Sequence, residues 1–401
     1  MATPRTVVYL HSSAGRYGAD LQLAALAGGL DRARFVPVCV LPERGELAGM
    51  LEERGAEVVV RPLAVLRRGL VNPGGLAALA GGLRRDRGEL GALARERGAA
   101  VVHANTSVVL GGGAAARAAG AAHVVHVREI YTGAANGAAG RLWPLLRRRL
   151  ERADALLCVS GAVAAQFRRR ATVVHDGLLR VPEPAARAEA RRVLDVPEGR
   201  FAVALLGRVS DWKGQDVLAR ALAEPVLAKA GAVGLIAGDA FPGNEQMERE
   251  LAELGARLGL GDRLRLLGFR DDVENVLGAA DAVAVPSTRP DPLPNSALEA
   301  AAAGLCVVAA AHGGLTEIVR DGETGLLTPP GDHVALAAAL ARLAADAALA
   351  RRLGEAAAAD ARERFALPRM LDEVQAVYEH VLARARPRRT HERPGAPPYT
   401  G

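Results

Sequence analysis

The chain has 401 residues and a formal net charge of +6; 50% of its residues are hydrophobic but only 3% are aromatic. This length exceeds what one hydrophobic core usually supports, so we expect two domains with cores of Ala, Leu and Val. The positive charge favours either anionic partners or simply an Arg-rich solvated surface, and no Lys/Arg run is interleaved with aromatic residues, which argues against nucleic acid as a partner.

The cysteines and the hydropathy of the chain indicate the cellular compartment in which we expect the protein. Cys39, Cys158 and Cys306 lie within apolar strand patterns, which is typical of small buried side chains in a reducing compartment and offers no metal-ligand spacing. No apolar stretch approaches the roughly 20 residues that span a bilayer, and no secretory signal pattern is recognised. We therefore expect a cytoplasmic protein. Arginines at 67–68, 84–85 and 147–149 could make peripheral contact with an anionic membrane, or could be solvated helix faces.

Strand and helix patterns alternate through residues 1–180. Apolar runs predict strands at 6–10, 35–41, 57–61, 101–103, 124–127, 155–159 and 172–174, with helices at 21–30, 47–54, 73–98, 143–150 and 162–170. This alternation predicts a Rossmann-like domain with a parallel sheet covered on both faces. The first loop carries Gly15 and Gly18, which do not form the dinucleotide pattern G-x-G-x-x-G, and we expect its backbone to approach another kind of ligand.

Polar residues follow the predicted strands of this first domain. They are His11, Ser12, Asn105, Thr106, His126, Arg128, Glu129 and Ser160. Each can be read as a cap or a solvated loop residue. Because the carboxyl ends of parallel strands share one edge of the sheet, their convergence favours a site there.

The character of the sequence changes at residues 181–200, where three prolines and many charges predict a linker with a short helix. A second α/β series is predicted at 201–367, with strands at 201–206, 233–237, 264–267, 282–285 and 306–309. A helix at 368–385 should follow. The polar, Pro-rich tail at 386–401 is predicted to be disordered.

Candidate catalytic and binding residues follow the predicted strands of the second domain. Arg208 and Lys213 follow the strand at 201–206, and two cations there suit a diphosphate. Asp291 and Glu299 stand eight positions apart, in a loop and in the helix that Asn295 or Ser296 can cap. Carboxylates beside a helix N-terminus suit a polyhydroxylated phosphate ester. The alternative is a capped surface helix and two exposed cations in a turn.

Several longer motifs resemble those of a known protein family. They are G-R-V-S-D-W-K-G at 207–214, A-G-D at 237–239, L-G-F-R-D-D at 267–272, D-P-L-P-N-S-A-L-E-A-A-A-A-G at 291–304 and G-G-L-T-E-I-V-R-D-G-E-T-G-L-L at 313–327, with Y-G-A-D at 17–20, V-S at 159–160 and H-D-G-L at 175–178. With these motifs, the chain resembles the GT-B glycosyltransferases of family 4, a retaining group that uses nucleotide-sugar donors. The resemblance extends to about residue 382. It implies an α/β fold of two Rossmann-like domains whose parallel sheets face across a cleft, with the last helix crossing back to the first domain.

The resemblance implies roles for matching residues. Arg208 and Lys213 would hold the donor diphosphate and neutralise the leaving group, and Glu299 would take the ribose hydroxyls. Asp291 stands where the E-x7-E motif of the family usually has its first Glu, which contacts the donor sugar, and Asp is shorter by one methylene.

His126 matches the family histidine beside the 6-hydroxyl of the sugar, and Arg128 or Glu129 are alternatives for that role. The other donor contacts that the resemblance implies are Gly15 and Gly18 beside the phosphate, Phe269 and Arg270 near the base, and Leu293, Pro294, Asn295 and Ser296 at the helix N-terminus.

The implied function is retaining transfer of a sugar from a nucleotide-diphosphate sugar to an acceptor hydroxyl, without metal or cofactor. The acceptor, whether saccharide, lipid-linked or small molecule, would be selected by first-domain loops such as 62–75 and 128–142. Two alternatives stay open: a nucleotide-sugar-binding protein in which Asp291 marks lost catalysis, and a GT-B sugar-nucleotide epimerase.

Overall fold

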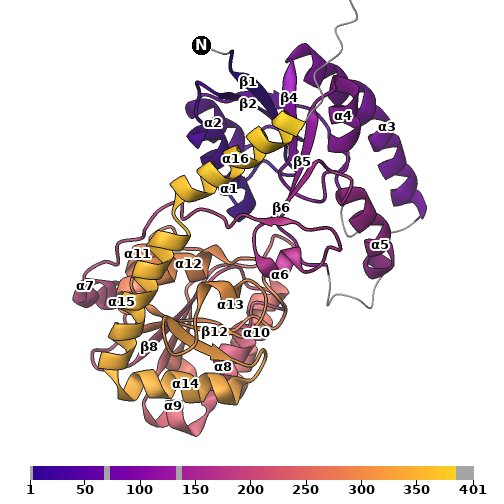
Figure 1. Cartoon of the computed structure of the whole chain (residues 1–401). Helices are drawn as coiled ribbons and strands as arrows, with labels where there is room; N and C mark the ends of the chain where they lie inside the picture. Colours follow the sequence, from indigo (N-terminus) through magenta and orange to yellow (C-terminus); the bar gives the residue numbers. More distant parts are fainter. Residues whose placement is uncertain (1–2, 67–72, 132–137, 385–401) are drawn as a thin grey trace, which may run out of the picture.

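Two parallel sheets, of seven and six strands, form the centres of two α/β domains, which are the upper and lower lobes of Figure 1. The computed structural model describes residues 3–66, 73–131 and 138–384. This architecture confirms the predicted fold class. The predicted tail at 386–401 lies outside the described residues.

The first sheet has the strand order β3-β2-β1-β4-β5-β6-β7. Its strands are β1 (Arg5–Leu10), β2 (Phe35–Leu41), β3 (Glu57–Val60), β4 (Ala99–Ala104), β5 (Ala122–Val127), β6 (Ala155–Cys158) and β7 (Thr172–Val173). The helices between them are α1 (Gly18–Gly29), α2 (Glu46–Glu53), α3 (Pro73–Glu96), α4 (Gly112–Ala119), α5 (Ala138–Leu150) and α6 (Gly161–Ala164).

The second sheet has the strand order β10-β9-β8-β11-β12-β13. Its strands are β8 (Ala202–Leu206), β9 (Val233–Ala237), β10 (Leu264–Leu266), β11 (Ala282–Val285), β12 (Cys306–Ala310) and β13 (Gly325–Thr328). Its helices are α7 (Arg187–Val193), α8 (Gln215–Ala223), α9 (Pro225–Lys229), α10 (Gln246–Arg257), α11 (Val273–Ala279), α12 (Asn295–Ala302), α13 (Leu315–Ile318), α14 (His333–Ala345) and α15 (Ala347–Arg364), followed by α16 (Leu367–Arg384).

The central strands are continuous apolar runs because helices cover both faces of each sheet. All five residues of β8 are buried, as are all four of β11 and all five of β12. The loops beyond these strands approach one another closely. Gly238 has φ 143°, and a Cβ there would lie 2.2 Å from the carbonyl oxygen of Gly207, so this junction requires glycine.

Helix α16 runs from the second domain onto the first, as the yellow helix in Figure 1 shows. Its Tyr378 is fully buried, and its hydroxyl lies 2.9 Å from the hydroxyl of Tyr9 in β1 and 2.6 Å from Nδ1 of His103 in β4. A buried hydroxyl with two partners fixes the orientation of this helix on the first sheet.

Two local predictions were wrong, and one strand was missed. The helix expected at 162–170 ends at Ala164, because the side chain of Gln166 is drawn into hydrogen bonds with the backbone of Glu129 and Tyr131. The short strand β13 was not predicted at all. Helix α12 begins at Asn295, whose side chain makes no cap hydrogen bond, and the preceding Pro294 occupies the cap position.

Candidate functional site at the boundary between the two domains

Lys213 and Asp291 meet at the carboxyl edge of the second sheet. The Nζ atom of Lys213 lies 2.6 Å from Oδ2 of Asp291, and their side chains are 20% and 7% exposed. They follow β8 and β11, which are neighbours in the sheet, so strand order alone brings the two loops together. The structure therefore joins two predicted site residues into one ion pair.

The backbone around this pair is held by close contacts between loops. Gly214 has φ 81°, and a Cβ there would lie 2.1 Å from the carbonyl oxygen of Pro286. The N–H of Thr288 donates to the carbonyl of Trp212 at 2.7 Å, and the N–H of Gly314 donates to that of Asp291 at 2.7 Å. The loops after β8, β11 and β12 thus form one rigid support for the ion pair.

The N-terminus of α12 lies beside the first domain. A Cβ on Gly18, the first residue of α1, would lie 2.9 Å from Nδ2 of Asn295. The first N–H groups of a helix have no partner within the helix, and both helix starts carry positive partial charge. The predicted residues Gly18, Leu293, Pro294, Asn295 and Ser296 therefore gather where an anion would be stabilised from both domains.

Glu299 lies one turn further into α12, against the first domain. It lines a cavity of about 10 Å³ with Gln22, Gly177, Leu178, Leu179, Asn295 and Leu298. Burial raises the pKa of its carboxyl group. Such a volume holds about one water molecule, so a ribose beside Glu299 requires the residues around this cavity to shift.

Phe269 and Arg270 stand on the loop after β10. The Phe269 side chain is strongly exposed, and Nε of Arg270 donates to Oδ1 of Asp272 at 2.6 Å. That hydrogen bond raises the pKa of Arg270.

Gly15, in the first loop, is close to Asp20: a Cβ on Gly15 would lie 3.4 Å from its Oδ2.

His126, which was predicted to lie beside the donor sugar, is buried in the first sheet. It belongs to β5, is 0% exposed, and its ring centroid lies 5.7 Å from that of His103. Burial lowers its pKa well below the ordinary value. Arg128, just beyond the strand, reaches the sheet edge instead, where it pairs with Asp176 and donates from Nε to the carbonyl of Asn105 at 3.2 Å. The ring of His103 is one of the groups that pack against His126.

The other polar residues at the edge of the first sheet converge as predicted, but they bind one another. Nε2 of His11 lies 2.7 Å from Oδ1 of Asp20, and Nδ1 of His11 lies 3.1 Å from Nδ2 of Asn105. Burial alone would raise the pKa of Asp20, but hydrogen bonds from His11, Ser13 and the Tyr17 backbone outweigh it and lower the pKa. This network braces the first loop and α1.

Glu317 of α13 joins the domains, and sequence reasoning missed it. Its carboxylate accepts hydrogen bonds from the backbone N–H groups of Gly161 (2.9 Å) and Ala162 (3.1 Å), and lies 3.0 Å from Nε2 of His175. The only available signal was its position in the G-G-L-T-E motif at 313–317.

Two aromatic residues, Tyr17 and Phe241, were also missed. Both contact the guanidinium of Arg208, which follows β8. Their signal in the sequence was the rarity of aromatic residues in a chain where they make up 3%.

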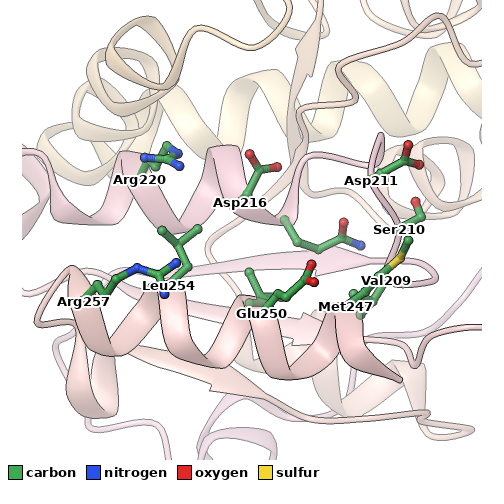
Figure 2. Close-up of a pocket in the computed structure, with 11 residues that line it drawn as sticks. Val209, Ser210, Asp211, Asp216, Arg220, Met247, Glu250, Leu254 and Arg257 are labelled. Atoms are coloured by element: carbon green, nitrogen blue, oxygen red, sulfur yellow. The ribbon is translucent and has the colours of Figure 1, made fainter. Parts of the chain in front are cut away.

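A separate cavity of about 280 Å³ lies between α8 and α10, where Asp211, Asp216, Arg220, Glu250 and Arg257 surround an apolar floor (Figure 2). Its lining contains none of the predicted site residues. Within the described residues, no group of three or more His, Cys, Asp and Glu side chains could hold a metal ion.

Within residues 3–66, 73–131 and 138–384, no single helix is long and apolar enough to cross a membrane. Helices α14 and α15 pass that test of length and composition only together, as a pair bent by 104°. The cysteines are buried and unpaired, and burial raises the pKa of both Cys158 and Cys306 to about 12. Arg67 and Arg68 lie outside the described residues.

Two family models match the chain: Glycosyltransferase Family 4 over residues 17–182, and Glycosyl transferases group 1 over residues 186–360. Among curated proteins, a D-inositol 3-phosphate glycosyltransferase of Salinispora tropica is 41% identical over 51% of this chain and 43% of its own length. The protein of the same name from Mycolicibacterium smegmatis is 33% identical over 68% and 64%. The chain thus spans about half the length of most curated relatives it matches.

Among solved structures, HepE of Anabaena, crystallised with UDP and glucose, superimposes with a TM-score of 0.78 at 27% identity, covering 93% of this chain and 99% of its own. A sucrose-phosphate synthase of Thermosynechococcus elongatus has the same fold, with a TM-score of 0.76 at 22% identity, covering 95% of this chain and all of its own.

Proposed function

The chain belongs to the family 4 glycosyltransferases with the GT-B fold, and we propose that it transfers a sugar from a nucleoside-diphosphate sugar to an acceptor hydroxyl. One observation carries the proposal. Arg208, Lys213 and the N-terminus of α12 lie at the same edge of the second sheet, and the N-terminus of α1 faces them from the first domain. Together they form an environment suited to a diphosphate.

The proposed reaction retains the configuration of the sugar. The acceptor oxygen bonds to the anomeric carbon on the face from which the diphosphate departs, and the acceptor proton passes to the departing phosphate oxygen. Arg208, Lys213 and the α12 N–H groups stabilise the negative charge that develops on that phosphate. Asp291 would contact the donor sugar and Glu299 the ribose. No metal or cofactor takes part in the proposed step.

The donor is proposed to be a UDP-sugar, supported by the relation to HepE, which was solved with UDP and glucose. Base recognition is assigned to the loop of Phe269 and Arg270, whose exposed ring is available for stacking. The acceptor is proposed to bind on the first domain, facing the same boundary.

A donor screen tests this function. Thermal melting with UDP-, GDP- and ADP-sugars should show stabilisation by one class of donor, since ligand binding raises stability by mass action. The stabilising donor should then release free sugar and nucleoside diphosphate slowly, with or without a metal chelator. Binding without turnover for every acceptor tried would instead indicate a nucleotide-sugar-binding protein, and isomerised donor would indicate an epimerase.

A further inference from the structure

The guanidinium of Arg208 contacts two aromatic rings from different domains. Its Cζ atom lies 4.4 Å from the ring centroid of Tyr17, which precedes α1, and 3.3 Å from that of Phe241, which follows β9. The two ring centroids are 5.9 Å apart and the rings are inclined by 52°, so they lie on adjacent sides of the guanidinium rather than on its two opposite faces. Both distances from Arg208 fall within the range of attractive cation–π contacts.

Neither ring belongs to a hydrophobic core. Tyr17 is 53% exposed and Phe241 is 48% exposed, although aromatic residues are rare in this chain. Exposed aromatic side chains gain little from burial, so core packing does not account for them. Their shared contact is with the cation of Arg208.

The contacts with the two rings do not supply hydrogen-bond acceptors for the N–H groups of the guanidinium. The five N–H donors of an Arg lie in the plane of the group, at its edge. Within the described residues, the guanidinium of Arg208 makes no hydrogen bond or ion pair, whereas Lys213 is paired with Asp291. Arg208 therefore keeps its N–H donors available for an incoming group while two rings restrict its position.

We propose that Tyr17 and Phe241 are positioning residues for Arg208. Contact with both rings restricts the guanidinium before the donor diphosphate arrives, which lowers the ordering cost of binding. Because the rings come from different domains, both contacts with Arg208 exist only while the domains are in contact. This inference rests on the proposed function.

The test compares Tyr17→Leu and Phe241→Leu with the ring-preserving variants Tyr17→Phe and Phe241→Tyr, and with Val226→Ala, an exposed apolar control on α9. Titration calorimetry with UDP, GDP and ADP gives the affinity, and donor kinetics give KM and kcat. Each Leu variant should bind the preferred diphosphate about tenfold more weakly and raise the donor KM, and the ring-preserving variants and the control should match the native chain.

A double-mutant cycle separates positioning from a structural role. In an Arg208→Ala background, Tyr17→Leu should cause no further loss of affinity, because the ring acts only through the guanidinium. Native affinity in both Leu variants, or an equal loss in the Arg208→Ala background, overturns the inference while the proposed function stands. Failure of the native chain to bind any of the three diphosphates overturns the proposed function, and the inference with it.

Discussion

The ammonium group of Lys213 lies 2.6 Å from the carboxylate of Asp291, in a setting where both side chains are mostly buried. The charge of Lys213 is therefore partly compensated before any ligand arrives. Arg208 differs, since aromatic faces rather than a carboxylate hold it. The two cations of the candidate diphosphate site are thus kept in place by different means, and substitutions should separate their contributions.

Removing either cation should impair transfer strongly. Arg208→Ala and Lys213→Ala are each expected to lower the rate of sugar transfer by ~10²-fold or more, because each removes a donor that stabilises the leaving diphosphate. The rate is measured as nucleoside diphosphate released from the preferred donor. Arg220→Ala is the matched control, since Arg220 lines the separate cavity between α8 and α10. Near-normal turnover of either site variant would contradict the diphosphate assignment.

Neutralising Asp291 should strengthen diphosphate binding while weakening catalysis. In Asp291→Asn the ligand no longer meets a nearby like charge, and we expect about tenfold tighter binding of UDP in calorimetry. Turnover should fall, because the proposed sugar contact loses its charge. Asp291→Glu keeps the charge and should bind UDP as the native chain does. Weaker binding by the Asn variant would show that Asp291 organises Lys213 rather than competing with the ligand.

The contact of Glu317 with the first domain should govern local opening of the boundary. Glu317→Ala removes the acceptor for the N–H groups of Gly161 and Ala162, so amide hydrogen exchange in the segment 160–166 should accelerate about tenfold. Glu323→Ala, at an exposed position nearby, serves as the control. Unchanged exchange in the Glu317 variant would mean that the domain contact does not persist in solution.

The hydroxyl of Tyr378 should contribute to stability through its buried partners. Tyr378→Phe leaves Nδ1 of His103 and the hydroxyl of Tyr9 without this contact, at an expected cost of about 1–3 kcal/mol in the free energy of unfolding. Urea denaturation measures this cost. Tyr17→Phe alters an exposed hydroxyl and should leave stability unchanged. Equal stability of both variants would refute the anchoring role of Tyr378.

Two buried histidines should make the protein acid-sensitive. Burial lowers the pKa of His103 to about 3 and that of His126 well below the ordinary value. Below about pH 6.5 the unfolded chain protonates both while the native state keeps them neutral, so stability falls as pH falls, by up to ~1.4 kcal/mol per pH unit for each.

Urea denaturation between about pH 7 and pH 5 measures this slope. His126→Leu should reduce the slope by up to ~1.4 kcal/mol per pH unit, which corresponds to the uptake of one proton. Replacement of the exposed His380 by Gln should leave the slope unchanged. A slope that is the same in all three proteins would show that His126 takes up its proton in the native state.

The two parallel sheets, and the sheet edge that carries the candidate site residues, follow from local sequence patterns. Apolar runs of strand length alternating with helical patterns specify parallel α/β domains, and residues that follow such strands must lie at the carboxyl edge. Arg208, Lys213 and Asp291 could therefore be assigned to one edge before any coordinates, because each follows an apolar run. The Pro-rich segment at 290–294, followed by Asn295 and Ser296, predicted a helix N-terminus beside them.

Which side chains contact one another depends on tertiary packing. His126 was expected at an accessible strand end, yet it has no exposed surface; its ring packs against His103, which in turn contacts Tyr378. The ring contacts of Arg208 and the hydrogen bonds of Glu317 join segments from different domains. Periodicity records how a segment pairs and which face it buries, but contacts across hundreds of residues depend on how finished domains pack, which no local pattern encodes.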